Sequence, residues 1–318
     1  MAGVYVAIFI ISCLILMRSG VWVVRALIRI AQFLKWKEFI VASFIMAFST
    51  SLPEIFVGVT SALAQKPNLS FGVVIGSNIV DLTLILGIGA LLAKGLTLRG
   101  RVVQRNAFYA GIYGLLPLLL MIDGNISRAD GAVLLLSMVF YFAQLLSEEE
   151  RFTRVFSDHL DEGWAHFKIF IKDLLFFGGA IVALLLSAEG IVYSSSQLAA
   201  NFNLSLLVIG AVLVSLGTSL PEIALGAKAI SMGHKKIIIG DLMGAIVVNS
   251  SFVLGLSAVI CPLTITDFSP YFVGIIFTVV TCFFFVAFAR TDRKITAREA
   301  IFLIGIYFFF LISEIMLK

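Results

Sequence analysis

The chain has 318 residues, of which 60% are hydrophobic and only 13% are charged. Soluble domains carry about 25% charged residues, so this composition and the mean hydropathy of +1.08 exclude an ordinary soluble protein. The formal charge of +4 is explained by basic loops beside a lipid surface, and it gives no reason to expect a nucleic-acid partner.

Apolar runs long enough to cross a bilayer follow one another along the whole chain. A helix needs about 20 apolar residues to span the hydrocarbon core, and the sequence predicts ten such spans. Their expected residues are 4–17, 38–63, 71–93, 106–122, 129–147, 170–188, 204–232, 237–260, 269–289 and 299–317. The first is short, and we expect its true end to lie beyond Arg18. The prediction is an all-α integral membrane protein with ten transmembrane helices.

Basic residues are distributed unequally between alternate connections. Nineteen of the 23 Lys and Arg residues fall on one side of the predicted membrane and three on the other. Loops rich in Lys and Arg remain cytoplasmic, so we expect both termini to be extracellular. Because five spans per half is an odd number, the second half enters the membrane from the opposite side, and the two halves are predicted to be inverted repeats with broken helices at the midplane.

The expected domain organisation follows from these repeats. Residues 1–147 form the first five-helix repeat, 148–168 a cytoplasmic linker, and 169–318 the second, inverted repeat. The linker mixes acidic and basic residues with two histidines, a pattern typical of an amphipathic surface helix. It lacks the spacing of an EF-hand calcium loop.

Two polar motifs recur at a constant offset of 168 residues. The stretch Ser49–Glu54 returns as Gly217–Glu222, and each copy lies within an apolar run. Further along, Gly76–Asp81 matches Gly244–Asn249. Two polar clusters in the same register indicate internal duplication.

The first motif places a carboxylate inside a membrane span in each half. A buried carboxylate is costly in hydrocarbon, so Glu54 and Glu222 are functional-site candidates. On a helix, Thr50 shares a face with Glu54, and Thr218 with Glu222. The proline of each motif cannot donate to the backbone carbonyl four residues earlier, and an oxygen freed in this way must line a cavity or meet a ligand.

These groups are hard oxygen donors of the kind that calcium binds. Calcium takes six to eight such oxygens in flexible geometry. No His or Cys lies near the motifs in the sequence, which argues against zinc, copper and iron. The sequence therefore predicts an oxygen-lined cation site formed by the two halves together.

The second motif adds further polar groups. Ser77 and Asp81 are four residues apart, and Asn249 is the counterpart of Asp81. Gly72 and Gly76 are expected to allow close helix packing, which brings these groups towards the glutamates. Because two glutamates already balance one dication, we expect Asp81 to be neutral and hydrogen-bonded to Asn249 while calcium is bound.

Asp241 lies near the predicted cytoplasmic start of the eighth span. Two interpretations remain open for it. It could attract cations to the inner mouth of a pathway, or it could simply be a solvated residue of a helix start.

The paired motifs resemble the alpha repeats of the sodium/calcium exchanger family, within the cation/calcium antiporter superfamily. The Gly-Thr-Ser-Leu-Pro-Glu core is complete at Gly217–Glu222 and has Ser for Gly at Ser49–Glu54. The whole chain resembles the compact prokaryotic members. The resemblance implies a cell-membrane antiporter, not an enzyme, that exchanges calcium for sodium by alternating access, with inorganic cations as substrates and no resident cofactor.

The resemblance also implies residue roles. Calcium would be bound by Glu54, Glu222, Thr50 and Thr218. Flanking sodium sites would use Ser51, Ser77, Ser219 and the backbone at Ala47 and Ser215, with Asp81 and Asn249 as the central polar pair.

Three positions depart from the family pattern. Ala245 stands where Ser is usual, and Ala offers no side-chain oxygen for a sodium ion. Val73 and Asp241 stand where Asn is common. A calcium/proton antiporter of the same fold is therefore the alternative.

Two other classes of protein compete with an antiporter. A cation channel needs a continuous pore, usually built by oligomeric symmetry, and inverted, proline-broken helices argue against it. An intramembrane enzyme could use the two glutamates as acid and base, but no nucleophile–base pair, metal-binding histidine or cofactor motif accompanies them.

Overall fold

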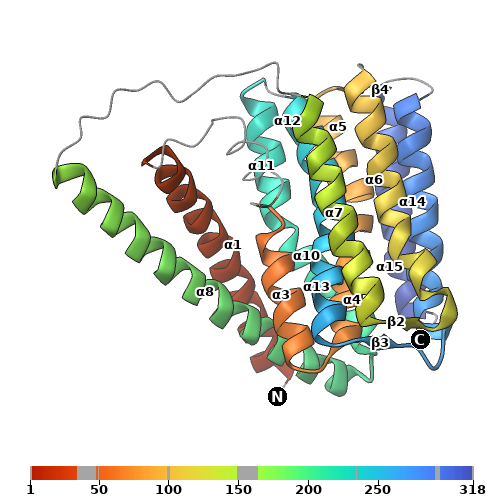
Figure 1. Cartoon of the computed structure of the whole chain (residues 1–318). Helices are drawn as coiled ribbons and strands as arrows, with labels where there is room; N and C mark the ends of the chain where they lie inside the picture. Colours follow the sequence, from red (N-terminus) through yellow and green to blue (C-terminus); the bar gives the residue numbers. More distant parts are fainter. Residues whose placement is uncertain are drawn as a thin grey trace.

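The computed structural model describes residues 2–33, 48, 50–98, 101–148, 164–233, 235–290 and 294–316. Within these residues the chain forms ten helical segments at the positions of the ten predicted spans, and eight of them are long and apolar enough to cross a membrane. Figure 1 shows them as a bundle with one oblique pair of helices at its side. The predicted all-α membrane fold is confirmed.

The main helices of the two halves follow one another in the same order, apart from α9, η3 and α10, which have no counterpart among the described residues of the first half. The first half consists of α1 (Ala2–Phe33), α3 (Leu52–Leu63), α4 (Pro67–Val80), the π-helical turn η1 (Asp81–Ile85), α5 (Leu86–Leu92), α6 (Arg101–Leu120), the 3-10 turn η2 (Met121–Asp123) and α7 (Arg128–Glu148). The second half consists of α8 (Trp164–Phe202), α9 (Leu206–Ile209), the π-helical turn η3 (Gly210–Val214), α10 (Ser215–Thr218), α11 (Leu220–Ser231), α12 (Lys235–Val247), the π-helical turn η4 (Val248–Val253), α13 (Leu254–Ile260), the 3-10 turn η5 (Ser269–Tyr271), α14 (Phe272–Arg290) and α15 (Ala297–Met316).

The predicted sixth span was too short, whereas the first continues beyond Arg18 as expected. The sixth was expected to end at residue 188 and continues as α8 to Phe202, and α1 continues to Phe33. These helices are counterparts in the two halves, and they pack against each other as the oblique pair (Figure 1). Their mutual packing keeps both helical beyond the apolar runs, and Arg29 of α1 forms an ion pair of 2.9 Å with Asp173 of α8.

Two short strand pairs reveal the inverted relation of the halves. Strand β1 (Leu96–Thr97) pairs antiparallel with β4 (Lys294–Ile295), and β2 (Asn125–Ile126) pairs with β3 (Leu263–Thr264). By order along the chain, β1 corresponds to β3 and β2 to β4. The β1–β4 and β2–β3 pairs lie at opposite ends of the molecule (Figure 1), so exchanging the halves converts one pair into the other, as an inverted repeat requires.

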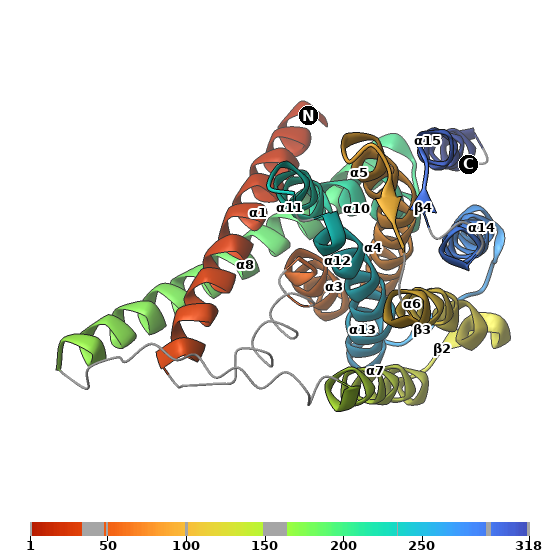
Figure 2. The same cartoon turned by 90° about the horizontal axis from the view of Figure 1, so that it is seen from above.

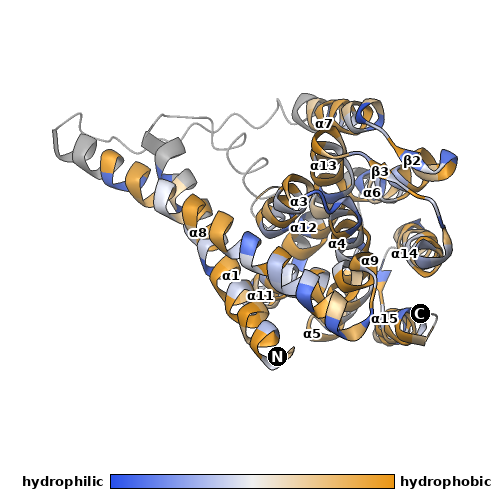
Figure 3. Ribbon diagram, turned by 90° about the horizontal axis from the view of Figure 1, so that it is seen from below, coloured by the Kyte–Doolittle hydropathy of each residue, from blue (hydrophilic) through white to orange (hydrophobic). Residues whose placement is uncertain are grey.

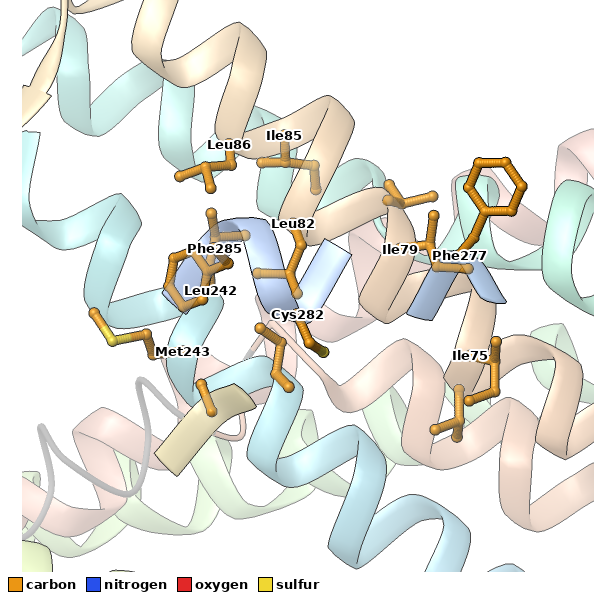
Figure 4. Packing of buried hydrophobic residues seen from close by; sticks show 14 of the residues in the cluster. Ile75, Ile79, Leu82, Ile85, Leu86, Leu242, Met243, Phe277, Cys282 and Phe285 are labelled. Atoms are coloured by element: carbon orange, nitrogen blue, oxygen red, sulfur yellow. The ribbon is translucent and has the colours of Figure 1, made fainter. Parts of the chain in front are cut away.

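The matching spans α4–η1–α5 and α12–η4–α13 occupy the centre of the molecule. They are the most buried of the eight apolar spans, with 89% and 83% of their most apolar segments inside the structure. Seen from above, α6, α7, α14 and α15 surround them on one side and the α1–α8 pair extends on the other (Figure 2). Figure 4 shows the side chains that fill this centre, including Ile75, Ile79, Leu82, Ile85, Leu86, Leu242, Met243, Phe277, Cys282 and Phe285.

Hydrophobic residues make up much of each peripheral helix (Figure 3), and many of their large apolar side chains are exposed. Leu175 of α8, Phe283 of α14 and Phe309 of α15 are each more than 60% exposed. Soluble proteins do not expose apolar surface on this scale, whereas lipid tails solvate it. The chain is an integral membrane protein.

Candidate cation site

Both copies of the first motif give the backbone the same conformation directly before a helix. Ser51 has φ −80° and ψ 1° directly before α3, and Ser219 has φ −81° and ψ 4° directly before α11. In the second half the break lies between α10, which ends at Thr218, and α11, which begins at Leu220. The predicted break is confirmed there. Glu54 and Glu222 lie in the first turn of α3 and α11, where the helix dipole favours a negative charge.

The two glutamates are fully buried but differ in their partners. Glu54 is 0% exposed and Glu222 is 1% exposed. Ser77 Oγ donates to Glu54 Oε1 at 3.4 Å. Glu54 Oε2 and both carboxylate oxygens of Glu222 have no hydrogen-bond partner in the protein. Three of the four carboxylate oxygens are therefore available to a ligand.

The hydroxyl groups of the two motifs lie beside these carboxylates. Ser51 Oγ and Ser219 Oγ are buried and have no hydrogen-bond partner. Thr218 Oγ1 donates to the backbone oxygen of Ser215 at 3.1 Å, and Ser215 Oγ donates to that of Ala211 at 2.6 Å. Ala47, predicted to contribute its backbone, and Ser49 of the motif lie outside the described residues.

Close packing of glycines positions the second motif, as expected for Gly72 and Gly76. A Cβ atom on Gly72 would lie 2.3 Å from the backbone oxygen of Leu207, and one on Gly76 would lie 2.2 Å from that of Ala211. No side chain fits at these distances, so α4 is in backbone contact with α9 and η3. This contact brings Ser77 to the site from the first half.

Asp81 and Asn249 lie in matching π-helical turns, η1 and η4. Turns of this kind frequently occur at functional sites, and both residues are at most 1% exposed. The predicted hydrogen bond between them is not made in this structure, because all four of their side-chain polar atoms are without a partner. A π-helical turn alters the side-chain register, and the polar contact is made instead by Asn78 Nδ2, which donates to Ser250 Oγ at 2.7 Å.

Asp241 belongs to the same site, which excludes one of the two interpretations left open for it, a solvated residue of a helix start. It lies well inside α12, which begins at Lys235, and is only 2% exposed. Thr50 Oγ1 donates to Asp241 Oδ1 at 2.9 Å, whereas Asp241 Oδ2 has no partner. The sequence did contain a sign that Asp241 is unusual: at the offset of 168 residues it corresponds to the apolar residue Val73 of the first half.

The arrangement suits hard cations held by dispersed oxygen ligands. The carboxylates of Glu54, Asp81, Glu222 and Asp241 are close enough to interact electrostatically. Within the described part of the chain, however, no three His, Cys, Asp or Glu side chains converge on one metal position. Ligation of a cation here would therefore combine carboxylates with hydroxyl and backbone oxygens, a donor set typical of sodium and calcium.

Inverted repeats, helices broken at the same motif and buried carboxylates between the halves define a secondary cation transporter. The chain belongs to the sodium/calcium exchanger family, whose model matches residues 4–146 and 172–316, one block in each half. It is thus a cation antiporter of that family and not an enzyme.

Individual relatives agree with this assignment. The inner membrane protein YrbG of Escherichia coli K12 is 30% identical over 239 residues, which cover 70% of each chain. The sodium/calcium exchanger MaX1 of Methanosarcina acetivorans is 24% identical and covers 96% of this chain and 97% of its own. The solved structure of the sodium-calcium exchanger NCX_Mj has the same fold, with a TM-score of 0.66 over the full length of both chains at 24% identity.

Proposed function

We propose that this antiporter moves calcium across the membrane in exchange for sodium by alternating access. The observation that carries the proposal is the pair of buried glutamates, one from each half, with three carboxylate oxygens that no protein group satisfies. A buried carboxylate without a partner is strongly unfavourable, and a dication between Glu54 and Glu222 would compensate both charges.

The proposed ligand set follows the residues around the two glutamates. Calcium is held by Glu54 and Glu222 with the hydroxyl groups of Thr50 and Thr218. Sodium uses the flanking oxygens of Ser51, Ser77, Ser219 and the backbone at Ala47 and Ser215, with Asp81 and Asn249 between the two kinds of site. The buried, unpartnered hydroxyl groups of Ser51 and Ser219 support this division.

A calcium/proton antiporter is the second candidate, and one observation favours it. Ala245 is completely buried at the position that corresponds to Ser77. It contributes no side-chain oxygen, so the flanking site on that side has one sodium ligand fewer than its counterpart.

The distribution of basic residues supports the proposed placement in the membrane. Both termini lie at the end of the molecule that carries β2 and β3 (Figure 1). The positive-inside rule assigns this end to the outside of the cell and the β1–β4 end to the cytoplasm. We place the protein in a prokaryotic cell membrane.

Calcium flux in proteoliposomes tests the function directly. The purified protein is reconstituted, and calcium uptake is measured with an outward sodium gradient, with a proton gradient, and with neither, using protein-free liposomes as control. Uphill uptake that requires the sodium gradient is the expected result. Uptake that requires only the proton gradient would identify the alternative, and passive calcium flux without any gradient would indicate a channel.

A further inference from the structure

The equivalent helices α4 and α12 carry their polar side chains at different positions along the helix axis. The face of α4 presents Val73 and, four residues later, Ser77, whereas α12 presents Asp241 and then Ala245. Residues four apart share one helix face and are separated by about 6 Å along the axis. In the second half the oxygen-bearing side chain is thus displaced by one turn, towards the start of α12, and it is a carboxylate instead of a hydroxyl.

Asp241 is built into the interior and still lacks one partner. Its Oδ1 accepts the hydroxyl of Thr50, which comes from the opposite half of the chain, and its Oδ2 is buried with no hydrogen-bond partner. Among the described residues it has no ion pair either. Because Thr50 donates its proton to Asp241, the lone pairs of the Thr50 hydroxyl remain available as acceptors. Two oxygens from different halves are therefore presented together.

The charges indicate more than one cation position. Asp241 interacts electrostatically with Glu54, Asp81 and Glu222, yet no three described acidic side chains converge on a single ion. A dication is already balanced by Glu54 and Glu222. A second dication close by would be repelled by the first, whereas one carboxylate with neutral oxygens balances a single positive charge.

We propose that Asp241 and Thr50 form a monovalent-cation subsite, one helical turn closer to the β1–β4 end than Ala245. This subsite takes the place of the flanking site that Ala245 cannot complete, and sodium is the probe for it. The inference rests on the proposed calcium site at Glu54 and Glu222 and adds a specificity-determining residue to it.

Two substitutions separate a charged ligand from a residue that only orients Thr50. Asp241→Asn keeps an oxygen that accepts the Thr50 hydroxyl but removes the charge. Asp241→Val introduces the residue that Val73 provides in the first half, and it removes both the charge and the oxygen that accepts the Thr50 hydroxyl. Asp123→Asn is the matched control, because Asp123 is exposed and its contact with the backbone of Asn125 is retained by Asn.

The readout is the stabilisation of the purified protein by cations. The melting temperature is titrated with sodium chloride against choline chloride at constant ionic strength, and separately with calcium. Ligand binding to the native state raises the melting temperature. We expect Asp241→Asn and Asp241→Val to weaken apparent sodium affinity by about tenfold, to weaken calcium affinity by a clearly smaller factor, and Asp123→Asn to leave both affinities unchanged.

Several outcomes would overturn the subsite. They are a wild type that sodium does not stabilise, equal sodium affinity in all variants, equal losses of sodium and calcium affinity, or a sodium loss in Asp241→Val but not in Asp241→Asn. The last result would show that Asp241 only positions Thr50. If Asp241→Val does not fold, Asp241→Asn alone still decides the sodium question, since it is nearly isosteric.

Flux measurements distinguish this inference from the proposed function. Sodium-driven calcium uptake that keeps its sodium dependence in Asp241→Asn would leave the function intact and remove the subsite. Sodium binding that depends on Asp241, in a wild type that exchanges calcium only for protons, would leave the subsite intact and remove sodium as the counter-ion.

Discussion

Glu54 and Glu222 occupy equivalent positions, yet their surroundings are unequal. Glu54 accepts a hydrogen bond from Ser77, whereas neither oxygen of Glu222 has a partner among the described residues. The difference follows from Ala245, which stands where Ser77 stands in the other half. At the scale of residues, the duplicated site is therefore asymmetric, and among the described residues both oxygens of Glu222 are left for a bound cation or a proton.

Removal of either carboxylate tests the central site. We expect Glu54→Gln and Glu222→Gln each to reduce calcium uptake to the level of protein-free liposomes, because a dication would then have too few negative ligands in a low-dielectric site. Gln preserves the shape of the side chain, so both proteins should elute as folded species in size-exclusion chromatography. Wild-type uptake in either variant would refute the assignment.

At the scale of elements, the contact of α4 with α9 and η3 positions the site. Gly72 and Gly76 bring the backbones together at distances that exclude any side chain. The two central spans are further joined by the hydrogen bond from Asn78 to Ser250. Matching π-helical turns at η1 and η4 show that the duplication extends to local backbone geometry.

The substitution Gly76→Ala, which adds one methyl group, tests whether this packing is as close as the structure shows. Gly76→Ala places a Cβ atom 2.2 Å from the backbone oxygen of Ala211, and backbone cannot move aside as a side chain can. Overpacking of this kind costs about 1–3 kcal/mol, so we expect a lower melting temperature together with reduced calcium uptake.

Gly178→Ala is the control for that experiment. Gly178 lies in α8 and has no described neighbour within 4 Å. Because Ala favours helix more than Gly by about 1 kcal/mol, the control should be neutral or slightly stabilised. Equal melting temperatures for the Gly76 and Gly178 variants would contradict the close-packing interpretation.

At the scale of the whole molecule, the strand pairs divide the connections between two ends. The β1–β4 pair lies at one end, and the β2–β3 pair lies with both termini at the other (Figure 1). This division agrees with the alternation of basic connections in the sequence. The assignment of the β1–β4 end to the cytoplasm stays a prediction.

Labelling of single cysteines tests that assignment. In a protein whose three cysteines are replaced, a membrane-impermeant maleimide should label Asp123→Cys, beside β2, in intact cells. Lys94→Cys, beside β1, should react only after permeabilisation, because basic connections remain inside. The reverse pattern of labelling would invert the proposed topology.

The sequence by itself determined the ten spans, the duplication, the broken helices and the pair of glutamates. These features are recorded locally, in runs of apolar residues and in motifs that recur at a fixed offset. The apolar run alone predicted too short a sixth span, because the length of α8 depends on its packing against α1 and not only on its own hydropathy. The hydrogen bond predicted between Asp81 and Asn249 with calcium bound is not made in this structure, and for the calcium-bound state it stays a prediction.

Only the tertiary structure decided the place of Asp241. Its hydrogen bond to Thr50 joins residues 191 positions apart, and no local pattern states which helix face meets a partner from the other half. A carboxylate near a helix start is solvated in one packing and becomes part of a cation site in another. Burial is a property of the assembled bundle. Asp241 became a candidate ligand only because the assembled structure buries it.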